Sequence, residues 1–349
     1  MVNPQTTLAR HAEVDERVSY DAAPHAPSTF ISAVIPTLNR LDPLRRALRS
    51  AIAQELPSGV RYEIVVIDNS TDANVRNVVA DVAALAKKSN STAEIRYVSE
   101  PNPGLSNARN AGVAAARGDW IAFLDDDQEA SPRWLKGFLI AIQNNRADAI
   151  FGPIDVEPEI KGQTLGPNKS LFHRHYEMMS GGDLTHRSAY LGTNNSFFNV
   201  QRCFTTRAPF STKLNSFGGE DSLLLKQLVT NGRRLAWAAE AKVTEFVPPH
   251  RMTRSYYFKR RFLSGQIRTL VYSMLQKPQW SQVAFWMAVG AIQFTVLGLG
   301  SLWYMILEPE IAFALQAAAF GGLGKLLWMK PFRDKLYAPR PAHAPSSPS

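Results

Sequence analysis

The feature that most constrains this chain is a long run without any charged side chain, Trp280–Leu307. At about 1.5 Å per residue, a helix of this length would measure roughly 42 Å, more than the roughly 30 Å of a bilayer's hydrocarbon core. A second apolar stretch, Ile311–Trp328, follows an acidic turn at Glu308–Glu310 and carries one charge, Lys325. Because cations lie outside both ends of the pair, the positive-inside rule predicts a two-helix transmembrane hairpin over 280–329 with both termini in the cytoplasm.

Two alternatives to this hairpin stay open. The two apolar stretches could be buried helices of a soluble domain, and the second could be a re-entrant segment that does not fully span. A charge-free run of this length is uncommon in a soluble core, which favours the membrane. Outside the main body, 1–29 is polar and 338–349 is rich in Pro, Ala and Ser, and we expect both to be disordered; 330–349 as a whole is expected to be a cytoplasmic tail. No apolar signal segment is visible in 1–29.

The segment before the apolar run, 251–279, is strongly basic. The chain has a net charge of +9, and no acidic residue occurs between Glu245 and Glu308. Apolar residues recur there at a spacing of three and four, from Phe258 to Leu275. This pattern predicts an amphipathic helix lying in a bilayer interface, with membrane lipids as partners. Nucleic acid is not expected as a partner, because the cations cluster beside the hairpin and no aromatic–basic RNA motif is present.

The body of the chain, 30–250, begins with alternating strand and helix patterns. Short apolar, β-branched runs alternate with stretches of helical periodicity, and helices on both faces of a mostly parallel sheet are the architecture that such repeats require. The predicted strands are 30–36, 62–67, 95–98, 120–124 and 147–151. The sequence therefore predicts an α/β fold, with a first half over 30–152 and a second over 153–250.

Polar clusters follow three of these strands directly. Thr37 and Asn39 follow the first strand, Asp68 follows the second, and Asp125–Asp127 follow the fourth. Ligands of open α/β sheets bind outside the carboxyl ends of the strands. Any single cluster could be ordinary turn chemistry, whereas three at one edge predict a site.

The three consecutive aspartates, Asp125–Asp127, are the sharpest local signal. Like charges at a strand end repel one another, so a cationic group should compensate them. Hard oxygen ligands suit Mg²⁺ or Mn²⁺, although a solvated acidic turn has the same sequence. Neither a G-x-G-x-x-G nor a G-x-x-x-x-G-K-[ST] motif occurs, which argues against a dinucleotide dehydrogenase and a P-loop NTPase.

Five motifs together resemble the family 2 glycosyltransferases of GT-A fold, in the order in which that family has them. The motifs are Val34-Ile-Pro-Thr-Leu-Asn-Arg40, Ile67-Asp-Asn-Ser-Thr-Asp72, Gly104-Leu-Ser-Asn-Ala-Arg-Asn-Ala-Gly112, Gly118-Asp-Trp-Ile-Ala-Phe-Leu-Asp-Asp-Asp127 and Gly218-Gly-Glu-Asp221. Within the family, the chain is most similar to bacterial exopolysaccharide enzymes of the succinoglycan-assembly type. The resemblance implies a GT-A domain over 30–250, with a nucleotide-sugar half and an acceptor half.

The resemblance also implies roles for single residues. Asp127 matches the direct ligand of Mg²⁺ or Mn²⁺, with Asp125 as the second, and Asp221 matches the general base, with Glu220 orienting the acceptor. The positions that match contacts to the nucleotide sugar are Pro36, Thr37, Asn39, Asp68, Arg109, Asp125 and Asp126. Weaker matches for the diphosphate or the acceptor are His250, Arg251, Arg260 and Arg261, for which headgroup attraction is an equal alternative.

The function that the resemblance implies is an inverting transfer of one sugar from a nucleotide sugar, with UDP favoured, to a lipid-linked saccharide acceptor at the inner membrane. Other polysaccharide-assembly proteins are possible partners. The family's processive polymerases carry Q-x-x-R-W after the body, whereas this chain has Arg260-Arg-Phe-Leu-Ser-Gly-Gln266. That departure favours a single addition over a processive synthase. A non-catalytic membrane protein that binds nucleotide sugar is a further alternative, and Leu191–Asn195 could line the acceptor pocket or form an ordinary loop.

Overall fold

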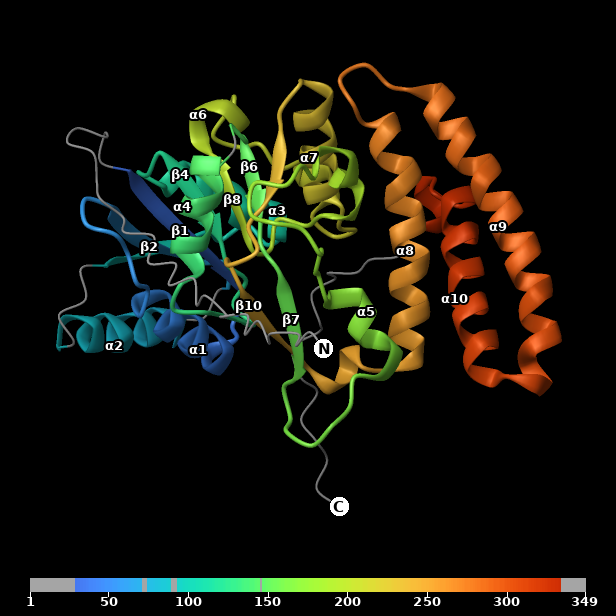
Figure 1. Cartoon of the computed structure of the whole chain (residues 1–349), viewed down its shortest axis with the longest axis horizontal. Coiled ribbons are helices and arrows are strands. Elements are labelled where there is room, and N and C mark those ends of the chain that lie inside the picture. The colour runs from blue at the N-terminus through green and yellow to red at the C-terminus, as the bar shows by residue number, and fades with distance from the viewer. Residues whose placement is uncertain (1–28, 71–73, 89–92, 145, 334–349) are drawn as a thin grey trace, which may run out of the picture.

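The computed structural model describes residues 29–70, 74–88, 93–144 and 146–333. The expectations of disorder for 1–29 and 338–349 therefore fall almost entirely outside the described residues. Within them, an α/β body is followed by three long helices at one end of the molecule (Figure 1).

A seven-stranded sheet forms the centre of the body. Its order is β3-β2-β1-β4-β8-β6-β9, and β8 is antiparallel to both of its neighbours while the other pairs are parallel. The strands are β1 (Phe30–Thr37), β2 (Arg61–Asp68), β3 (Glu94–Ser99), β4 (Trp120–Phe123), β6 (Ala149–Phe151), β8 (Ser196–Asn199) and β9 (Leu235–Trp237). All five predicted strands are present, and the mostly parallel sheet is confirmed as a mixed sheet with one reversed strand.

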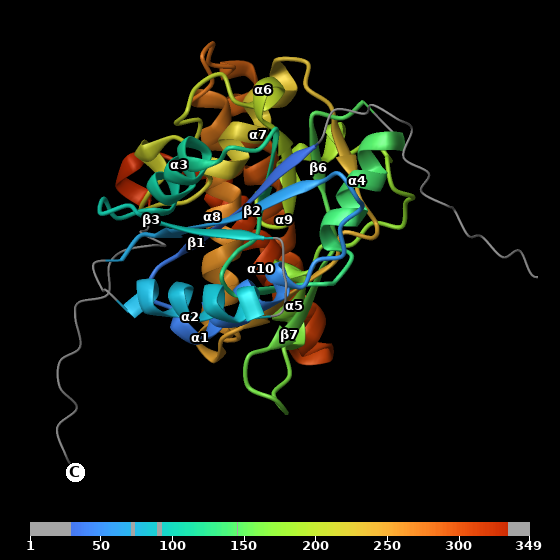
Figure 2. The ribbon, with the colours of Figure 1, turned by 90° about the vertical axis from the view of Figure 1, so that its left-hand side faces the viewer.

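Helices cover both faces of this sheet because its strands bury side chains on both sides. In β1, Ile31 and Ile35 pack with one cluster of helices, and Val34 points to the other. The first cluster uses α1 (Leu41–Ile52), α2 (Asn74–Lys88) and α4 (Trp134–Asn144). The second uses α3 (Leu105–Ala115) and α7 (Glu220–Thr230). Viewed from the side of the body, the strands lie between these two layers (Figure 2). Two further helices, α5 (Lys169–Phe172) and α6 (Val200–Cys203), are single turns.

A second, three-stranded sheet was not predicted. It consists of β5 (Gln128–Ala130), β10 (Val243–Val247) and β7 (Ile154–Pro158), in the order β5-β10-β7. Strands of three to five residues are too short for periodicity to reveal them. This sheet carries the end of the body back to the aspartate loop, because the backbone N–H of Phe246 donates to the carbonyl of Asp127 at 2.9 Å.

Three long helices follow the body, and only one of them fits the predicted transmembrane hairpin. They are α8 (Arg254–Ser273), α9 (Trp280–Leu307) and α10 (Pro309–Leu326). Among the described residues, α9 alone is long and apolar enough to cross a bilayer, with a mean hydropathy of 1.7 in its most apolar window. In α10, Lys325 donates from Nζ to Oε1 of Gln293 at 2.5 Å, and the small side chains of the helix are buried against its neighbours. The two-helix hairpin is therefore not confirmed.

The basic helix α8 also differs from its predicted position. Its apolar face was expected in a bilayer interface, but Leu263, Leu270 and Val271 are buried in a cluster with the body's Leu214, Phe217 and Leu223. The opposite side of α8 contacts α10. The periodicity of an amphipathic helix is the same whether its apolar face meets lipid or protein, so the sequence could not distinguish the two.

Candidate active site

The triple-aspartate loop lies at the carboxyl edge of the central sheet, directly after β4. Asp126 and Asp127 are buried, whereas the side chain of Asp125 is 28% exposed. The backbone N–H of Leu124 donates to the carbonyl of Val34 at 3.1 Å, which ties the start of the loop to β1. A backbone turn from Gln128 to Asp125, at 3.0 Å, closes the loop.

Three arginines, Arg40, Arg251 and Arg109, supply positive charge to this loop. The guanidinium of Arg40 donates to Asp126 at 2.6 Å and to Asp127 at 2.9 Å, and Arg251 approaches Asp127 at 3.4 Å. The cationic compensation that the sequence predicts for this loop is thus present in arginine side chains. Arg40 was missed as a site residue, even though it ends the first motif. Its neighbour Asn39 has φ of 51°, a left-handed conformation that Asn tolerates, and it turns the chain after β1.

Arg109 joins the aspartate loop to the acidic motif on α7. Its Nη1 lies 2.5 Å from Oε1 of Glu220, and its Nη2 lies 3.7 Å from Oδ1 of Asp125. Both Arg109 and Glu220 are almost fully buried. Segments more than one hundred residues apart therefore meet at one point. Sequence reasoning assigned Arg109 to the nucleotide, whereas this structure places it in an ion pair between two acidic segments.

Asp221, the last residue of the same motif, is partly buried. Gly218 and Gly219 have φ of 93° and 89°, so the predicted tight turn before α7 is present, although both glycines are buried. The carboxylate of Asp221 accepts from the backbone N–H of Ser222 at 2.6 Å. Its Oδ2 lies so near Gly192 that a Cβ added there would be 3.1 Å away. The predicted acceptor loop, Leu191–Asn195, therefore lies directly against Asp221.

Arg174 holds that loop and was not predicted to belong to the site. Its buried guanidinium donates to the carbonyl of Gly192 at 3.2 Å, to that of Asn194 at 2.6 Å and to that of Asn195 at 2.7 Å. Burial lowers the pKa of Arg174 to about 10, which leaves the group charged at neutral pH. A charged arginine inside the domain fixes the backbone of the loop next to Asp221 without contacting Asp221 itself.

The predicted nucleotide residues form a continuous edge beside the aspartates. Thr37 donates from Oγ1 to Asp126 at 2.7 Å, and it is paired in register with Asp68. Asp68 is buried and accepts from the hydroxyl of Tyr97 at 2.8 Å. Pro36 is buried in β1, and Asn39 is exposed. The structure thus brings the predicted residues of β1, β2 and the aspartate loop together.

Burial and mutual repulsion dominate the titration of the acidic groups. Burial, and next the charge of Asp127, raise the pKa of Asp126, and Arg40 opposes this shift. Burial, and next the charge of Asp221, raise the pKa of Glu220, and Arg109 opposes it. Glu245 on β10, another buried carboxyl that sequence reasoning missed, has a pKa raised by burial and by the nearby aspartates. Acidic side chains therefore concentrate at this edge, and burial favours their neutral forms.

The donor set fits a divalent ion that shares its coordination with substrate. Among the described residues, no group of three or more His, Cys, Asp or Glu side chains could hold a metal by itself. Mg²⁺ typically takes one or two carboxylates, with phosphates and water completing the shell. Asp125 and Asp127 would supply those two. Burial raises the pKa of Asp125, Arg109 opposes this shift, and the charge of Asp127 adds to it; a cation would relieve the repulsion between the two carboxylates.

The weaker predicted positions are only partly drawn into the site. Arg251 reaches Asp127, and its neighbour His250 is exposed in the turn Pro249–Arg251. Arg260 and Arg261 lie in the second turn of α8, and the guanidinium of Arg261 lies 6.0 Å from the centre of the Tyr257 ring.

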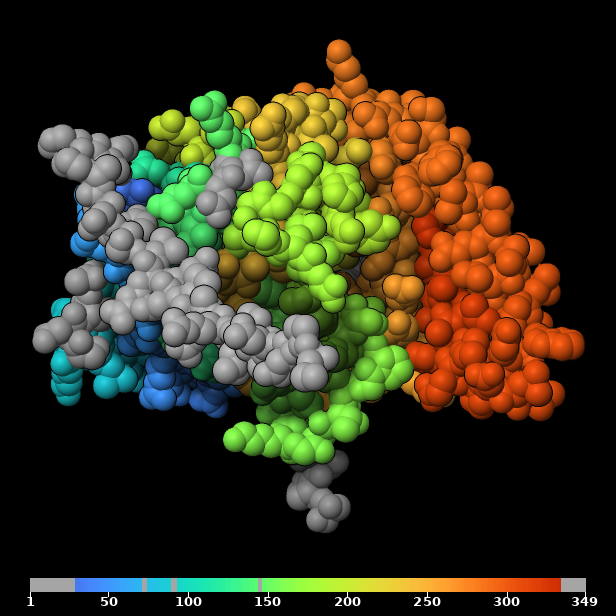
Figure 3. Space-filling view, viewed as in Figure 1, coloured from blue at the N-terminus to red at the C-terminus, as the bar shows by residue number. Residues whose placement is uncertain are grey.

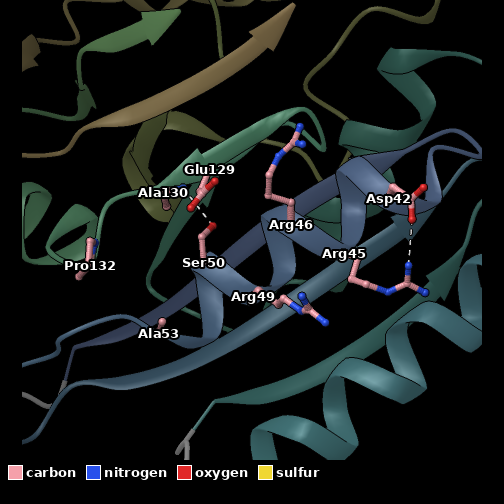
Figure 4. Close-up of a pocket in the computed structure, with 9 residues that line it drawn as sticks. All are labelled: Asp42, Arg45, Arg46, Arg49, Ser50, Ala53, Glu129, Ala130 and Pro132. Atoms are coloured by element: carbon pink, nitrogen blue, oxygen red, sulfur yellow. Dashed lines mark hydrogen bonds and ion pairs between the residues drawn. The ribbon is translucent and has the colours of Figure 1, made fainter. Parts of the chain in front are cut away.

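A pocket of about 520 Å³ lies elsewhere, between α1 and β5 (Figure 4). Its basic side chains are Arg45, Arg46 and Arg49, and none of its lining residues is a predicted site residue. Two of its lining residues, Glu129 and Ala130, lie in β5, directly after the aspartate loop.

Comparisons with known proteins agree with this fold. The model of the family described as "Glycosyl transferase family 2" matches residues 32–214. The succinoglycan biosynthesis protein ExoM of Rhizobium meliloti is 29% identical over 229 residues, which cover 64% of this chain and 69% of that protein.

Two solved structures are similar in shape. The mannosyltransferase PcManGT from Pyrobaculum calidifontis, in complex with GDP-Man and Mn²⁺, has a TM-score of 0.54 at 16% identity and covers 89% of this chain and 91% of its own. TarS 1-349 of S. aureus, in complex with UDP-GlcNAc, has a TM-score of 0.50 at 14% identity and covers 84% of this chain and 89% of its own. At these identities the likeness shows a shared GT-A-like fold.

Proposed function

The chain belongs to glycosyl transferase family 2, and from that premise we propose that it transfers one sugar from a UDP-sugar to a lipid-linked saccharide at a membrane. We further propose that the transfer inverts the anomeric carbon. ExoM is by name a protein of succinoglycan biosynthesis, which supports a role in exopolysaccharide synthesis and other assembly proteins as partners. A site on the cytoplasmic face of the inner membrane is part of the same proposal.

The observation that carries the proposal is the position of Arg109. Arg109 forms ion pairs with Asp125, in the loop that would meet the diphosphate, and with Glu220, in the motif that would meet the acceptor. The two segments therefore lie on either side of one side chain. A glycosyl transfer needs both groups around a single anomeric carbon. The acceptor loop held by Arg174 completes this arrangement next to Asp221.

The chemistry follows from what these residues can do. The acceptor hydroxyl attacks the anomeric carbon, a new carbon–oxygen bond forms, and the bond to the diphosphate oxygen breaks. Asp221, which is less buried than Glu220, takes the proton of the hydroxyl as general base. Glu220, held by Arg109, positions the start of α7 so that Asp221 faces the acceptor. We assign the binding of the uracil and ribose to Thr37 and Asp68, which are paired in register at the ends of β1 and β2.

A divalent ion would be held by Asp125 and Asp127, and it would stabilise the charge that builds on the departing diphosphate. The Mn²⁺ of the PcManGT complex supports this assignment, and Mg²⁺ has the same preference for oxygen ligands. UDP as the nucleotide is supported by the TarS complex with UDP-GlcNAc, whereas the GDP-Man of PcManGT keeps a guanine nucleotide as the alternative.

The proposal is tested with Asp221→Asn in the full-length protein. We expect transfer to fall by about 10² to 10⁴, because general-base catalysis contributes that much, while metal-dependent binding of UDP stays within about twofold. Asp81→Asn, the same change at an exposed position of α2, serves as the control and should leave both unchanged. The assay is a screen of UDP- and GDP-sugars against lipid-linked acceptors, with and without chelator.

The outcomes separate the alternatives. Normal turnover by Asp221→Asn would remove Asp221 from the mechanism. Binding of UDP by the wild type without transfer to any acceptor would favour the non-catalytic nucleotide-sugar-binding protein. Products longer by many sugars would favour a processive synthase over a single addition.

A further inference from the structure

The three C-terminal helices lie side by side with nearly parallel axes. The chain runs along α8, returns along α9 and runs forward again along α10, so α9 is antiparallel to both, whereas α8 and α10, which pack on each other, run in the same direction (Figure 1). α8 lies against the body, and α9 lies on the far side of the molecule from β3 (Figures 1 and 2). We call α8, α9 and α10 together the helical layer.

Glycines allow the helical layer to pack at very short distances. A Cβ added to Gly324 would lie 2.0 Å from the carbonyl oxygen of Phe262, and one added to Gly265 would lie 2.1 Å from that of Gly321. A Cβ added to Gly290 would lie 2.7 Å from the carbonyl oxygen of Gly322. The backbones of α8, α9 and α10 are therefore in contact, and the layer cannot open without losing these contacts.

Buried polar bonds further hold α10 to α8. The side chain of Gln266 is fully buried and donates to the carbonyls of Leu327, at 2.6 Å, and Phe332, at 2.8 Å. Thr269 donates to the carbonyl of Lys325 at 3.1 Å. Because α8 is also packed on Leu214, Phe217 and Leu223, the helical layer and the body form one unit.

This unit is incompatible with a bilayer that α9 crosses. A membrane perpendicular to α9 would contain α8 at the same depth, since the two helices lie side by side. α8 carries several cations, each of which costs about 2.5 to 3.5 kcal/mol or more at the centre of a membrane helix. They are Arg254, Lys259, Arg260, Arg261 and Arg268. The polar body attached to α8 would enter the hydrocarbon with them.

The outward face of α9 is nevertheless strongly apolar. Only 11% of the residues in the most apolar window of α9 are buried, and Ile306 and Trp303 are 89% and 73% exposed. The other large exposed apolar side chains of α9 are Trp280, Phe285, Ile292, Phe294, Val296, Leu299, Leu302, Met305 and Leu307. In the space-filling view, α9 forms the outer edge of the molecule, away from the body (Figure 3). A contiguous apolar surface of this kind marks a contact with a membrane or a protein.

We propose that the helical layer docks in the plane of a membrane surface, with the outward face of α9 in the boundary between headgroups and acyl chains. The protein is then monotopic, and the turn between α9 and α10 stays on the same side of the membrane as the body. This placement removes the apolar face of α9 from water and keeps α8 and the body out of the hydrocarbon. It does not depend on the proposed transferase activity.

Cations at one end of the helical layer favour anionic lipid over a second copy of the chain, while the opposite end carries Glu308 and Glu310 in the turn between α9 and α10. Lys277 lies in the loop before α9, and Lys330 and Arg333 follow α10. Anionic headgroups attract cations beside an interfacial apolar helix. A two-fold symmetric partner would instead present an identical surface with the same cations around it.

The decisive experiment labels the turn between α9 and α10. Glu308→Cys is placed in the full-length protein, where the native Cys203 is buried, and sealed inside-out membrane vesicles are treated with a membrane-impermeant maleimide. Asp81→Cys, on α2 of the body, is the control for the body's side. We expect both variants to be labelled from the same side. Labelling of Glu308→Cys only after the vesicles are opened would overturn the proposal in favour of a spanning hairpin.

A second experiment tests the face itself with a matched pair of substitutions. Leu299→Glu lies on α9 and is 65% exposed, whereas Leu85→Glu lies on α2 and is 44% exposed as wild-type leucine. Binding of the purified full-length chain to vesicles of phosphatidylcholine and phosphatidylglycerol should fall by about tenfold or more for Leu299→Glu, because the substitution places a charge on the face of α9 that enters the membrane. Leu85→Glu should bind like the wild type. Equal vesicle binding by both variants would contradict the proposal. A stable wild-type dimer that does not bind vesicles would contradict it as well.

Discussion

The aspartate edge and the helical layer are held together by opposite kinds of interaction. At the edge, Arg40 and Arg109 join charged groups from distant segments in largely buried ion pairs. In the helical layer, Gly265 and Gly324 let backbones touch, and few charges take part. Removing one charge from the edge leaves its partner buried and uncompensated, whereas adding one methyl group to the layer forces two helices apart. The two regions should therefore be sensitive to different substitutions.

The largest effect is expected at the centre of the edge. Arg109→Met leaves Glu220 buried without its cation, and we expect a loss of about 3 to 5 kcal/mol in the free energy of unfolding, measured by denaturant titration. The double variant Arg109→Met, Glu220→Leu should recover part of this loss, because both charges are gone. A double variant no better than the single would show that the pair itself is not the cause.

An exposed arginine provides the control for this prediction. Arg45 pairs with Asp42 at 3.0 Å, three residues apart on α1, and the Asp42 side chain is 92% exposed. Arg45→Met should cost at most about 0.5 kcal/mol, because water and salt already screen such a pair. A cost as large as that of Arg109→Met would mean that burial is not what distinguishes the edge.

The next largest effect on stability is expected in the helical layer, where the substitution of Gly by Ala is compared at a packed and at an open position. Gly324→Ala introduces a methyl group against the carbonyl of Phe262, and we expect a loss of about 1 to 3 kcal/mol. Gly298→Ala, on α9, meets no atom within 4 Å and should stabilise the helix by about 0.5 to 1 kcal/mol. Thermal unfolding in detergent, followed by circular dichroism, compares the two. Equal shifts of the same sign would show that α10 is not packed on α8 through Gly324.

The smallest effect is expected at the rim of the aspartate edge. Arg251 lies 3.4 Å from Asp127 and is 27% exposed, so Arg251→Met should change the free energy of unfolding by less than about 1 kcal/mol. Binding of UDP, measured by calorimetry, should weaken more than stability does if Arg251 serves the diphosphate. Unchanged binding would confine Arg251 to a surface ion pair.

Most of the central sheet and the carboxyl edge could be predicted from local patterns. Strand periodicity and the polar residues after each strand identify Thr37, Asp68 and Asp125 without any tertiary information, because parallel strands place their ends at one edge. The motif at Glu220 and Asp221 was identified only through the resemblance to a family. Its position beside the aspartate loop required the fold, since Arg109 and Glu220 are separated by 111 residues.

Other parts of the site left no local signal. Arg40 is one arginine among many, and its contacts with Asp126 and Asp127 depend on where the chain turns at Asn39. Arg174 and Glu245 are buried ionisable groups, which sequence patterns do not reveal because such residues are usually exposed. The three-stranded sheet that carries Glu245 is built from pairings between distant short segments.

The sequence by itself determined the α/β alternation, the family and the existence of a long apolar helix, because each is encoded by residue type and spacing within a short window. Only the tertiary structure decided that the apolar face of α8 packs on the body, and which cation meets which carboxylate. Amphipathic periodicity reports that one side of a helix avoids water, but it does not say whether lipid or protein covers that side. Contacts such as Gly324 with Phe262, and Arg109 with Glu220, depend on the path of the whole chain.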